Sequence, residues 1–340
     1  MPYHIHWFKK NLRFQDNEIL LKTYNSSPIL LYIIEPELWL QKDMSQRQWE
    51  FIWESLKSLK IDLAKNNLYL NILSGDALEI FQKLYQKYSF TKVISEQETG
   101  IHWTFERDKK LKSLFKDLKV NWVEYPYFGV KRGSHNRDHW AGSIQQILKK
   151  PLINKEKYIN QCKILEFEDY NIPINFYDKT PCPFRQKGGG HQAHDLLRTF
   201  LESRGENYQR EMSSPITAEH SCSRLSPHFA NGTLSLRQAY QLAEKKRFEV
   251  QSTNKVFAKS INAFLSRLHW RSHFIQKLED EPSIELKSFI PLYDDIRDQD
   301  EEKLRLWIKG ETGIPFIDAC MIYLRNHGWI NFRMRAMLAS

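Results

Sequence analysis

The run Tyr3-His4-Ile5-His6-Trp7-Phe8 sets the pattern of the first half of the chain. Four more short runs rich in apolar and β-branched residues follow, at 29–34, 68–73, 92–95 and 120–125. Each has the length of a buried strand, and near-continuous apolar runs are typical of a parallel sheet that is covered on both faces. Residues 3–8 therefore begin a series of five predicted strands.

Amphipathic segments separate these strands. Residues 47–64 place Phe51, Leu56 and Leu63 on one helical stripe, and residues 77–88 show the same spacing. Strands that alternate with helices through short turns form right-handed βαβ units. The first half is therefore predicted to be a doubly wound α/β domain. The segment after the first strand lacks the GxGxxG fingerprint, which argues against a nicotinamide enzyme.

The second half has a different pattern. Residues 127–187 are rich in Pro, Gly and polar residues and read as an interdomain connection, with one helix predicted at 140–147. Beyond the triple glycine at 188–190 no strand pattern occurs. Helices are predicted at 191–201, 235–245, 257–279, 301–310 and 315–328. The predicted fold class is α/β followed by all-α, with a domain at 1–126, a connection at 127–187 and a helical domain at 188–340.

The composition limits the class of protein. Fifty Lys and Arg face forty-one Asp and Glu, a formal net charge of +9, which favours a polyanionic partner such as nucleic acid. Aromatic residues make up 13% of the chain and suit stacking on bases or on a ring cofactor, although any single one is more often a core residue. The four cysteines are widely spaced, so we expect reduced thiols and no metal site. No window approaches the ~18 apolar residues of a membrane span, and we expect a cytoplasmic monomer.

The loop Cys222-Ser223-Arg224-Leu225-Ser226-Pro227 combines two hydroxyls, backbone N–H groups and a guanidinium. Such a set can hold an anion such as a pyrophosphate. As an isolated pattern it is more often a helix N-cap or a Ser/Thr turn than a phosphate site.

A second candidate site lies at 264–271. Helical spacing places Phe264, Arg267, Leu268 and Arg271 along one face. Trp270 has two readings, as a residue packed between helices or as a platform on which a base stacks.

Three segments together resemble the photolyase and cryptochrome flavoproteins. The loop at 222–227, with its glycine-rich and Ser-Leu-Arg neighbours, is similar to the family's flavin pyrophosphate loop, TSRLSPYLxxGxxSxR. The stretch 7–17 is similar to WFRxDLRxxDN, with Asn11 in place of Asp; its Arg13 and Asp16 could equally anchor the first loop to the sheet. The stretch 307–340 is similar to WxxGxTGxPxxDAxMRxLxxxGWxxNRxRMxxAS. The resemblance covers residues 7–340.

The resemblance implies FAD, folded into a U within the helical domain and excited by blue light. It also implies a second, light-harvesting chromophore of folate or deazaflavin type in the N-terminal domain, near Glu98-Thr99-Gly100 and Arg107-Asp108. The residues it assigns to FAD are Tyr208, Cys222, Ser223, Arg224, Leu225, Ser226, Phe264, Arg267 and Arg271.

The expected activity is that of a DNA photolyase, a carbon–carbon lyase in which excited reduced flavin passes an electron to a pyrimidine dimer. By position, Trp270 matches the Trp that stacks on the flipped-out dimer, and Arg335 matches an Arg beside the flavin ring. These two are the expected catalytic residues. Trp270, Phe332 and Ala336 are the expected contacts with the DNA lesion.

Three departures keep other readings open. Arg267 stands where dimer photolyases carry Glu, Phe332 where they carry Asn, and Ala336 where they carry Met. A guanidinium only donates hydrogen bonds whereas a carboxylate only accepts them, so the usual dimer contact cannot form unchanged. A cryptochrome-like photoreceptor or a non-repair flavoprotein is therefore the alternative. Outside the family, the pattern also fits an α/β nucleotide-binding protein with a helical accessory domain.

The last residues, 334–340, contain no Gly, Pro or polar tail and resemble a cut through a helix. We expect a helical domain that is incomplete at its C-terminus and that holds FAD weakly.

Overall fold

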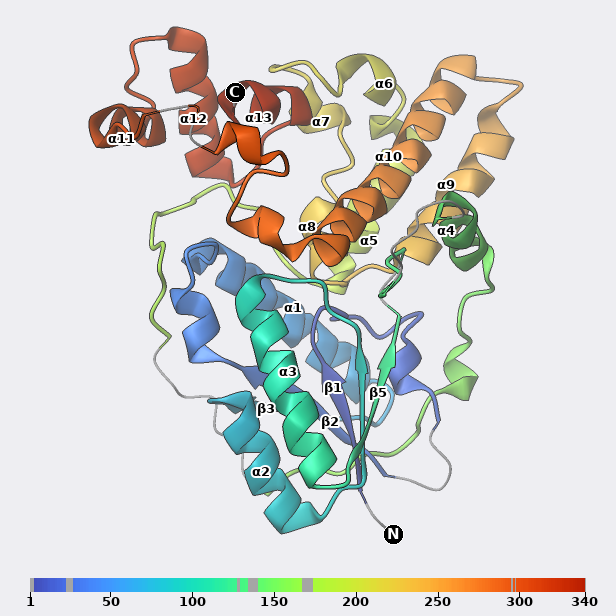
Figure 1. Cartoon of the computed structure of the whole chain (residues 1–340). Helices are drawn as coiled ribbons and strands as arrows, with labels where there is room; N and C mark the ends of the chain where they lie inside the picture. The colour runs from blue at the N-terminus through green and yellow to red at the C-terminus, as the bar shows by residue number, and fades with distance from the viewer. Residues whose placement is uncertain are drawn as a thin grey trace.

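The computed structural model describes residues 3–22, 27–126, 129–133, 140–166, 174–294, 296 and 298–339. Parts of the predicted connection and Ser340 lie outside these residues. An α/β half carries the N-terminus, and a helical half lies beside the carboxyl ends of its strands (Figure 1).

The first half contains one parallel five-stranded sheet. Its strands are β1 His4–Phe8, β2 Ile29–Ile34, β3 Leu70–Ser74, β4 Lys92–Glu96 and β5 Asn121–Tyr125. They lie in the order β3-β2-β1-β4-β5, and every pair is parallel. This confirms the doubly wound prediction. The order reverses between β1 and β4, where such folds have a crevice at the carboxyl ends of the strands.

Helices cover both faces of the sheet. Helix α1, Gln46–Ala64, buries Leu56, Leu59 and Leu63 against the face that includes Phe8. Helices α2, Ala77–Tyr88, and α3, His102–Asp117, cover the face that includes Ile5 and Trp7. The alternation along β1 follows from the two-residue period of a strand.

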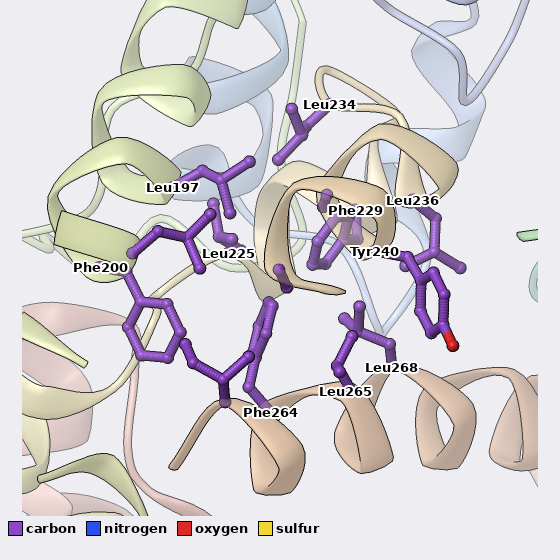
Figure 2. Close-up of a cluster of buried hydrophobic side chains, with 14 of the residues drawn as sticks. Leu197, Phe200, Leu225, Phe229, Leu234, Leu236, Tyr240, Phe264, Leu265 and Leu268 are labelled. Atoms are coloured by element: carbon purple, nitrogen blue, oxygen red, sulfur yellow. The ribbon is translucent and has the colours of Figure 1, made fainter. Parts of the chain in front are cut away.

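The second half is helical, as predicted. Its longest element is α10, Lys255–Asp280. The other helices are α5 Gly190–Thr199 with a π-helical extension Phe200–Arg204, α6 Tyr208–Glu211, α7 Ala218–Ser221, α8 Ser226–Ala230, α9 Leu236–Val250, α11 Glu301–Lys309, α12 Pro315–His327 and α13 Phe332–Ala339. Figure 2 shows the core, in which Leu197 and Phe200 face Phe264 and Leu268 of α10 across Leu225.

The helix predicted within the connection belongs to this helical core. Helix α4, Trp140–Lys149, buries Ile144 and Leu148 in the same cluster as α9 and α10. The sequence could not show this because the contacting residues are about a hundred positions apart. Short 3-10 turns complete the chain at Glu18–Leu20, Pro36–Leu40, Lys155–Lys157, Pro282–Glu285 and Pro291–Tyr293.

The two halves meet through the first loop after β1. The backbone N–H of Leu12 donates to the carbonyl of Asn231 at 3.1 Å. Asp16 accepts hydrogen bonds from Ser235 and Arg237, and all three side chains are buried. Gly232 has φ +63°, and a Cβ there would lie 2.1 Å from the carbonyl oxygen of Lys10, so only glycine fits. Asp16 therefore joins the two domains rather than only anchoring the loop to the sheet.

The described residues contain neither a membrane-spanning helix nor a metal-binding cluster. No helix among them is long and apolar enough to cross a membrane. Within the same ranges, no group of three His, Cys, Asp or Glu side chains is placed to hold a metal ion.

Candidate functional site

A cavity of about 440 Å³ lies where α10 and the loop before α8 approach the α/β domain. Its volume falls within the range of small-molecule sites. The residues around it are Lys10, Thr99, Tyr208, Ser223, Ser226, Phe229, Ala230, Phe264, Arg267, Leu268, Arg271 and Ile275.

Six of the nine residues assigned to FAD from sequence line this cavity. Tyr208 comes from α6, and Ser223 and Ser226 come from the loop and the start of α8. Phe264, Arg267 and Arg271 lie on α10, where the predicted helical spacing brings them to one face. The structure thus brings together the hydroxyls of the loop and the cations of the helix.

The other three residues of the loop turn elsewhere. Leu225 is fully buried and packs in the core between α5 and α10 (Figure 2). The guanidinium of Arg224 lies over the ring of Trp329 at 4.1 Å and contacts Glu219 at 3.4 Å. Cys222 is half-buried, and burial raises the pKa of its thiol to about 11, so the thiol is neutral at physiological pH. Leu225 and Arg224 fix the loop and do not line the cavity.

The cavity is suited to an anion. Lys10, Arg267 and Arg271 line it, and none of its described lining residues carries a carboxylate. Arg271 also donates to the carbonyl of Phe229 at 2.9 Å, which holds the guanidinium in place. Burial raises the pKa of Tyr208 to about 12, so its phenol remains protonated. Hydroxyls and cations around an aromatic wall fit a ring cofactor that carries a pyrophosphate.

Trp270 lies beside the cavity, on the exposed face of α10. Its side chain is 47% exposed and is not part of the lining. The ring centroid of Phe274 lies 5.9 Å from that of Trp270 at an interplanar angle of 32°, and His273 contacts Trp270 edge-on at 5.7 Å. The alternative reading of Trp270 as a residue buried between helices is wrong.

The residues predicted on the last helix are not brought to this cavity. Phe332 is 70% exposed, and Arg335 and Ala336 are also exposed on α13. None of the three lines the cavity. Their assignments to flavin and lesion stay predictions.

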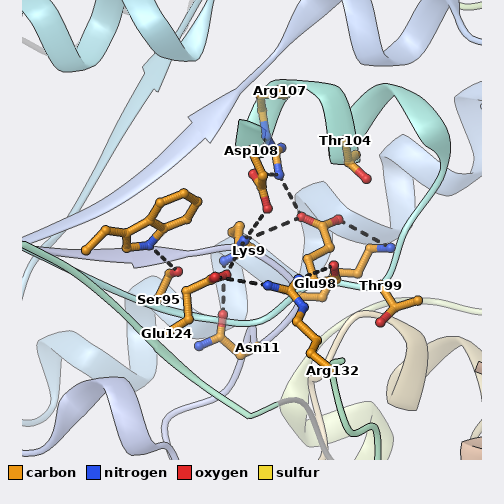
Figure 3. A network of polar contacts seen from close by, with 12 residues as sticks. Lys9, Asn11, Ser95, Glu98, Thr99, Thr104, Arg107, Asp108, Glu124 and Arg132 are labelled. Atoms are coloured by element: carbon orange, nitrogen blue, oxygen red, sulfur yellow. Dashed lines mark hydrogen bonds and ion pairs between the residues drawn. The ribbon is translucent and has the colours of Figure 1, made fainter. Parts of the chain in front are cut away.

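The crevice at the carboxyl ends of β1 and β4 is occupied by an ion-pair network (Figure 3). Lys9 lies 3.1 Å from Asp108, and Arg107 lies 2.6 Å from Glu35 and 2.8 Å from Glu98. Burial raises the pKa of Glu35 to about 7 although Arg107 opposes it. Burial also acts to raise the pKa of Glu98, but Lys10, Arg107 and Lys9 hold it well below its usual range.

The ion-pair network lies in the region where the second chromophore was expected. Glu98, Arg107 and Asp108 belong to the motif by which the N-terminal domain resembles one that holds such a chromophore, and in the structure they pair with one another and with Lys9. A separate cavity of about 430 Å³, lined by Trp39 and other residues, lies at the domain junction nearby. The position of a second chromophore in this chain stays a prediction.

Sequence reasoning missed the contribution of the α/β domain to the FAD-type cavity. Lys10 and Thr99 line it from loops that follow β1 and β4. No local motif could reveal this, because their proximity to α10 depends on how the two domains pack.

Comparison with known proteins decides the family. Residues 4–126 match the profile described as "DNA photolyase", and residues 264–340 match "FAD binding domain of DNA photolyase". The chain belongs to the photolyase and cryptochrome family. FAD is therefore the cofactor of the helical domain, and the reading as an unrelated nucleotide-binding protein is wrong.

Individual relatives include both kinds of family member. Cryptochrome-2 of Gallus gallus is 25% identical over 367 residues, which cover 98% of this chain and 61% of that protein. Deoxyribodipyrimidine photo-lyase of Escherichia coli is 25% identical over 364 residues, which cover 100% of this chain and 74% of that protein. The chain thus spans about three fifths of the length of the cryptochromes that it matches.

Solved structures confirm the fold. The Synechocystis cryptochrome superposes with a TM-score of 0.82 at 19% identity, covering 100% of this chain and 74% of that one. An archaeal photolyase from Sulfolobus tokodaii, described as containing two FAD molecules, gives 0.75 at 23% identity and covers 99% and 74% of the two chains. At these identities the similarity concerns the fold alone.

Proposed function

We propose that the protein is a blue-light-driven photolyase-type flavoprotein that acts on a pyrimidine dimer in DNA. The observation that carries this proposal is the exposed Trp270–Phe274 pair on α10, one helical turn from the cavity-lining Arg267 and next to Arg271. An exposed aromatic surface beside a cationic cavity matches what an extruded, damaged nucleotide requires.

The free energy gained by stacking a base on Trp270 is comparable to the free energy that extruding the base costs. Stacking a base on an aromatic ring contributes about 1–3 kcal/mol. Extruding a damaged base from the duplex costs a few kcal/mol. A single ring can therefore decide whether the extruded state is populated, and the net positive charge assists through contacts with phosphates.

FAD, when bound, supplies light-driven electron donation. The residues of this chain bind and orient the cofactor and the substrate. Ser223, Ser226 and the cations of α10 would hold the cofactor's phosphates, and Trp270 would hold the substrate's rings. No acid or base group of the chain has to transfer a proton in this proposal.

The test is light-dependent repair of DNA that contains a cyclobutane dimer, in single- and double-stranded form. Trp270→Ala should weaken dimer affinity by about 1–3 kcal/mol because one stacking surface is lost. Phe248→Ala removes an exposed aromatic ring from α9 and serves as the control. Absence of repair by the wild-type protein loaded with reduced FAD would refute the proposal.

A cryptochrome-like photoreceptor is the second candidate. Arg267 lines the cavity with a donor-only guanidinium, where dimer recognition would use an acceptor. If Arg267 disfavours the dimer, Arg267→Glu should raise the affinity for the dimer in protein that is saturated with FAD, although the loss of a cavity-lining cation should weaken FAD binding itself. Flavin photochemistry without repair, even of the 6-4 photoproduct and in the Arg267→Glu variant, would favour the photoreceptor.

A further inference from the structure

The loop at 222–226 has an unusual backbone that needs external support. Arg224 adopts φ +60°, a left-handed conformation that is uncommon for a residue with a side chain. Leu225 anchors one end of the loop in the core. The carbonyl groups of the loop, however, are held by side chains from outside it.

Arg204 provides most of that support. Its guanidinium donates to the carbonyls of Cys222, of His220 at 2.9 Å and of Ser223 at 3.4 Å. It also donates to the carbonyl of Leu196 at 3.1 Å, which ties the loop to α5. The carbonyl of Arg224 accepts a hydrogen bond from the side-chain amide of Gln186 at 2.7 Å.

The π-helical turn Phe200–Arg204 places this guanidinium. The turn continues α5 and ends at Gly205, where a Cβ would lie 2.7 Å from the carbonyl oxygen of Phe200. The ring of Phe200 packs against Tyr208 at 5.6 Å and Phe264 at 4.9 Å, and both of these residues line the cavity. Isolated π-turns of this kind are frequent at functional sites.

We propose that Arg204 is a positioning residue for the pyrophosphate of FAD. By holding the carbonyls of residues 220, 222 and 223 on the side away from the cavity, it turns the backbone N–H groups and the hydroxyls of Ser223 and Ser226 toward the ligand. Among the described residues, the N–H groups of Ser223 and Arg224 have no acceptor within the chain. A phosphate oxygen would supply one.

The proposal rests on FAD as the family's cofactor and does not depend on DNA repair. The two parts of FAD have different contacts: the loop recognises the pyrophosphate, whereas the flavin ring is bound elsewhere in the cavity. A change at Arg204 should therefore affect ligands that carry the pyrophosphate and spare those that lack it.

The experiment compares the affinities of the apo-protein for FAD and for riboflavin, each followed by flavin fluorescence. Arg204→Gln should weaken FAD binding by about tenfold or more, because several charge-assisted hydrogen bonds that set the loop are lost. Riboflavin binding should change by less than about twofold, since riboflavin lacks the phosphates. Arg204→Lys, which keeps the charge but not the planar fork, should restore part of the FAD affinity.

Arg198→Gln is the matched control, because Arg198 is an exposed arginine of α5 that pairs with Glu202. Its affinities for both ligands should equal those of the wild type. Hydrogen exchange at the hydrogen-bonded amides of Cys222 and Leu225 gives a readout without ligand. Exchange at these two amides should accelerate in Arg204→Gln and not in Arg198→Gln.

Two results would overturn the proposal. One is a parallel loss of FAD and riboflavin affinity in both Arg204 variants, which would indicate collapse of the whole cavity. The other is a wild-type protein that binds FAD no more tightly than riboflavin. Neither outcome bears on repair, which is measured separately with DNA.

Discussion

At the scale of single residues, burial decides which groups depend on pH. His6 lies in the middle of β1 with no exposed surface. Burial, with smaller contributions from the neighbouring His4 and Lys92, lowers the pKa of His6 to about 3, and a backbone hydrogen bond with Ile19 offsets this only in part. The imidazole is therefore neutral in the folded protein.

This predicts an acid-sensitive fold. Above pH 6.5 the unfolded imidazole is also neutral, and His6 imposes no penalty. As the pH falls from 6.5 toward 3 the unfolded state binds a proton that the folded state does not, so the free energy of unfolding falls by at most about 1.4 kcal/mol per pH unit from this group. His6→Val should remove the contribution of His6 to this pH dependence. The measurement is the free energy of unfolding in urea at pH 7 and at pH 5.

The control for this prediction is His102→Gln, which changes an exposed histidine at the start of α3. It should leave the difference between the two pH values unchanged. Some acid sensitivity should persist in His6→Val, because burial also lowers the pKa of His228, to about 4. An unaltered pH difference in His6→Val would contradict the assignment to His6.

At the scale of elements, glycines mark where helices can approach one another. Gly188 precedes α5 and lies against α1, and a Cβ at this position would be 2.0 Å from the carbonyl oxygen of Phe51. Gly142 lies within α4 and is exposed, and nothing lies within 4 Å of a Cβ built there. The same residue type is thus required at one position and dispensable at the other.

Alanine substitutions at these two glycines should have opposite effects. Gly188→Ala should lower the free energy of unfolding by about 1–3 kcal/mol, because the added methyl group forces α1 and α5 apart. Gly142→Ala should raise it by about 0.5–1 kcal/mol, because alanine loses less backbone entropy than glycine in a helix. Chemical denaturation of both variants provides the measurement, and destabilisation by Gly142→Ala would contradict the described geometry of α4.

Elements of this protein are largely predictable from local pattern, and the site only in part. Residues 29–34 and 77–88 show their strand and helix boundaries in the apolar spacing alone, and both match the structure. The loop hydroxyls and the α10 cations carry a motif and were found. Arg204 carries none: its role depends on a π-turn and on carbonyls up to nineteen positions away.

At the scale of the whole molecule, a buried contact joins the two domains. Asp16 follows β1 and Arg237 lies in the first turn of α9, and their side chains form an ion pair that is almost fully buried. Asp16 also accepts from the backbone N–H of Ile153 at 3.0 Å, so a segment of the connection is tied to the same carboxylate. The FAD-type cavity lies at this junction, since it takes Lys10 from one domain and α10 from the other.

The pair should therefore couple the stabilities of the domains. Asp16→Asn keeps the side-chain shape and suits the left-handed backbone at φ +50°, but it leaves the charge of Arg237 buried without its main counter-charge. We expect a loss of about 3 kcal/mol, the low end for breaking a buried pair, because Glu18 lies 3.9 Å from Arg237.

The double-mutant cycle with Arg237→Met isolates the pair from its surroundings. Asp16→Asn/Arg237→Met should be more stable than the sum of the single losses predicts, by about 0.5–3 kcal/mol, because the double variant buries neither charge. Glu302→Gln, which removes one partner of an exposed pair with Arg305 on α11, should change stability by at most about 0.5 kcal/mol. If the two domains unfold with one midpoint in the wild type and with two in Asp16→Asn, this contact is what makes them one cooperative unit. A coupling energy of zero would place the domain linkage elsewhere, at the close approach of Gly232 to Lys10.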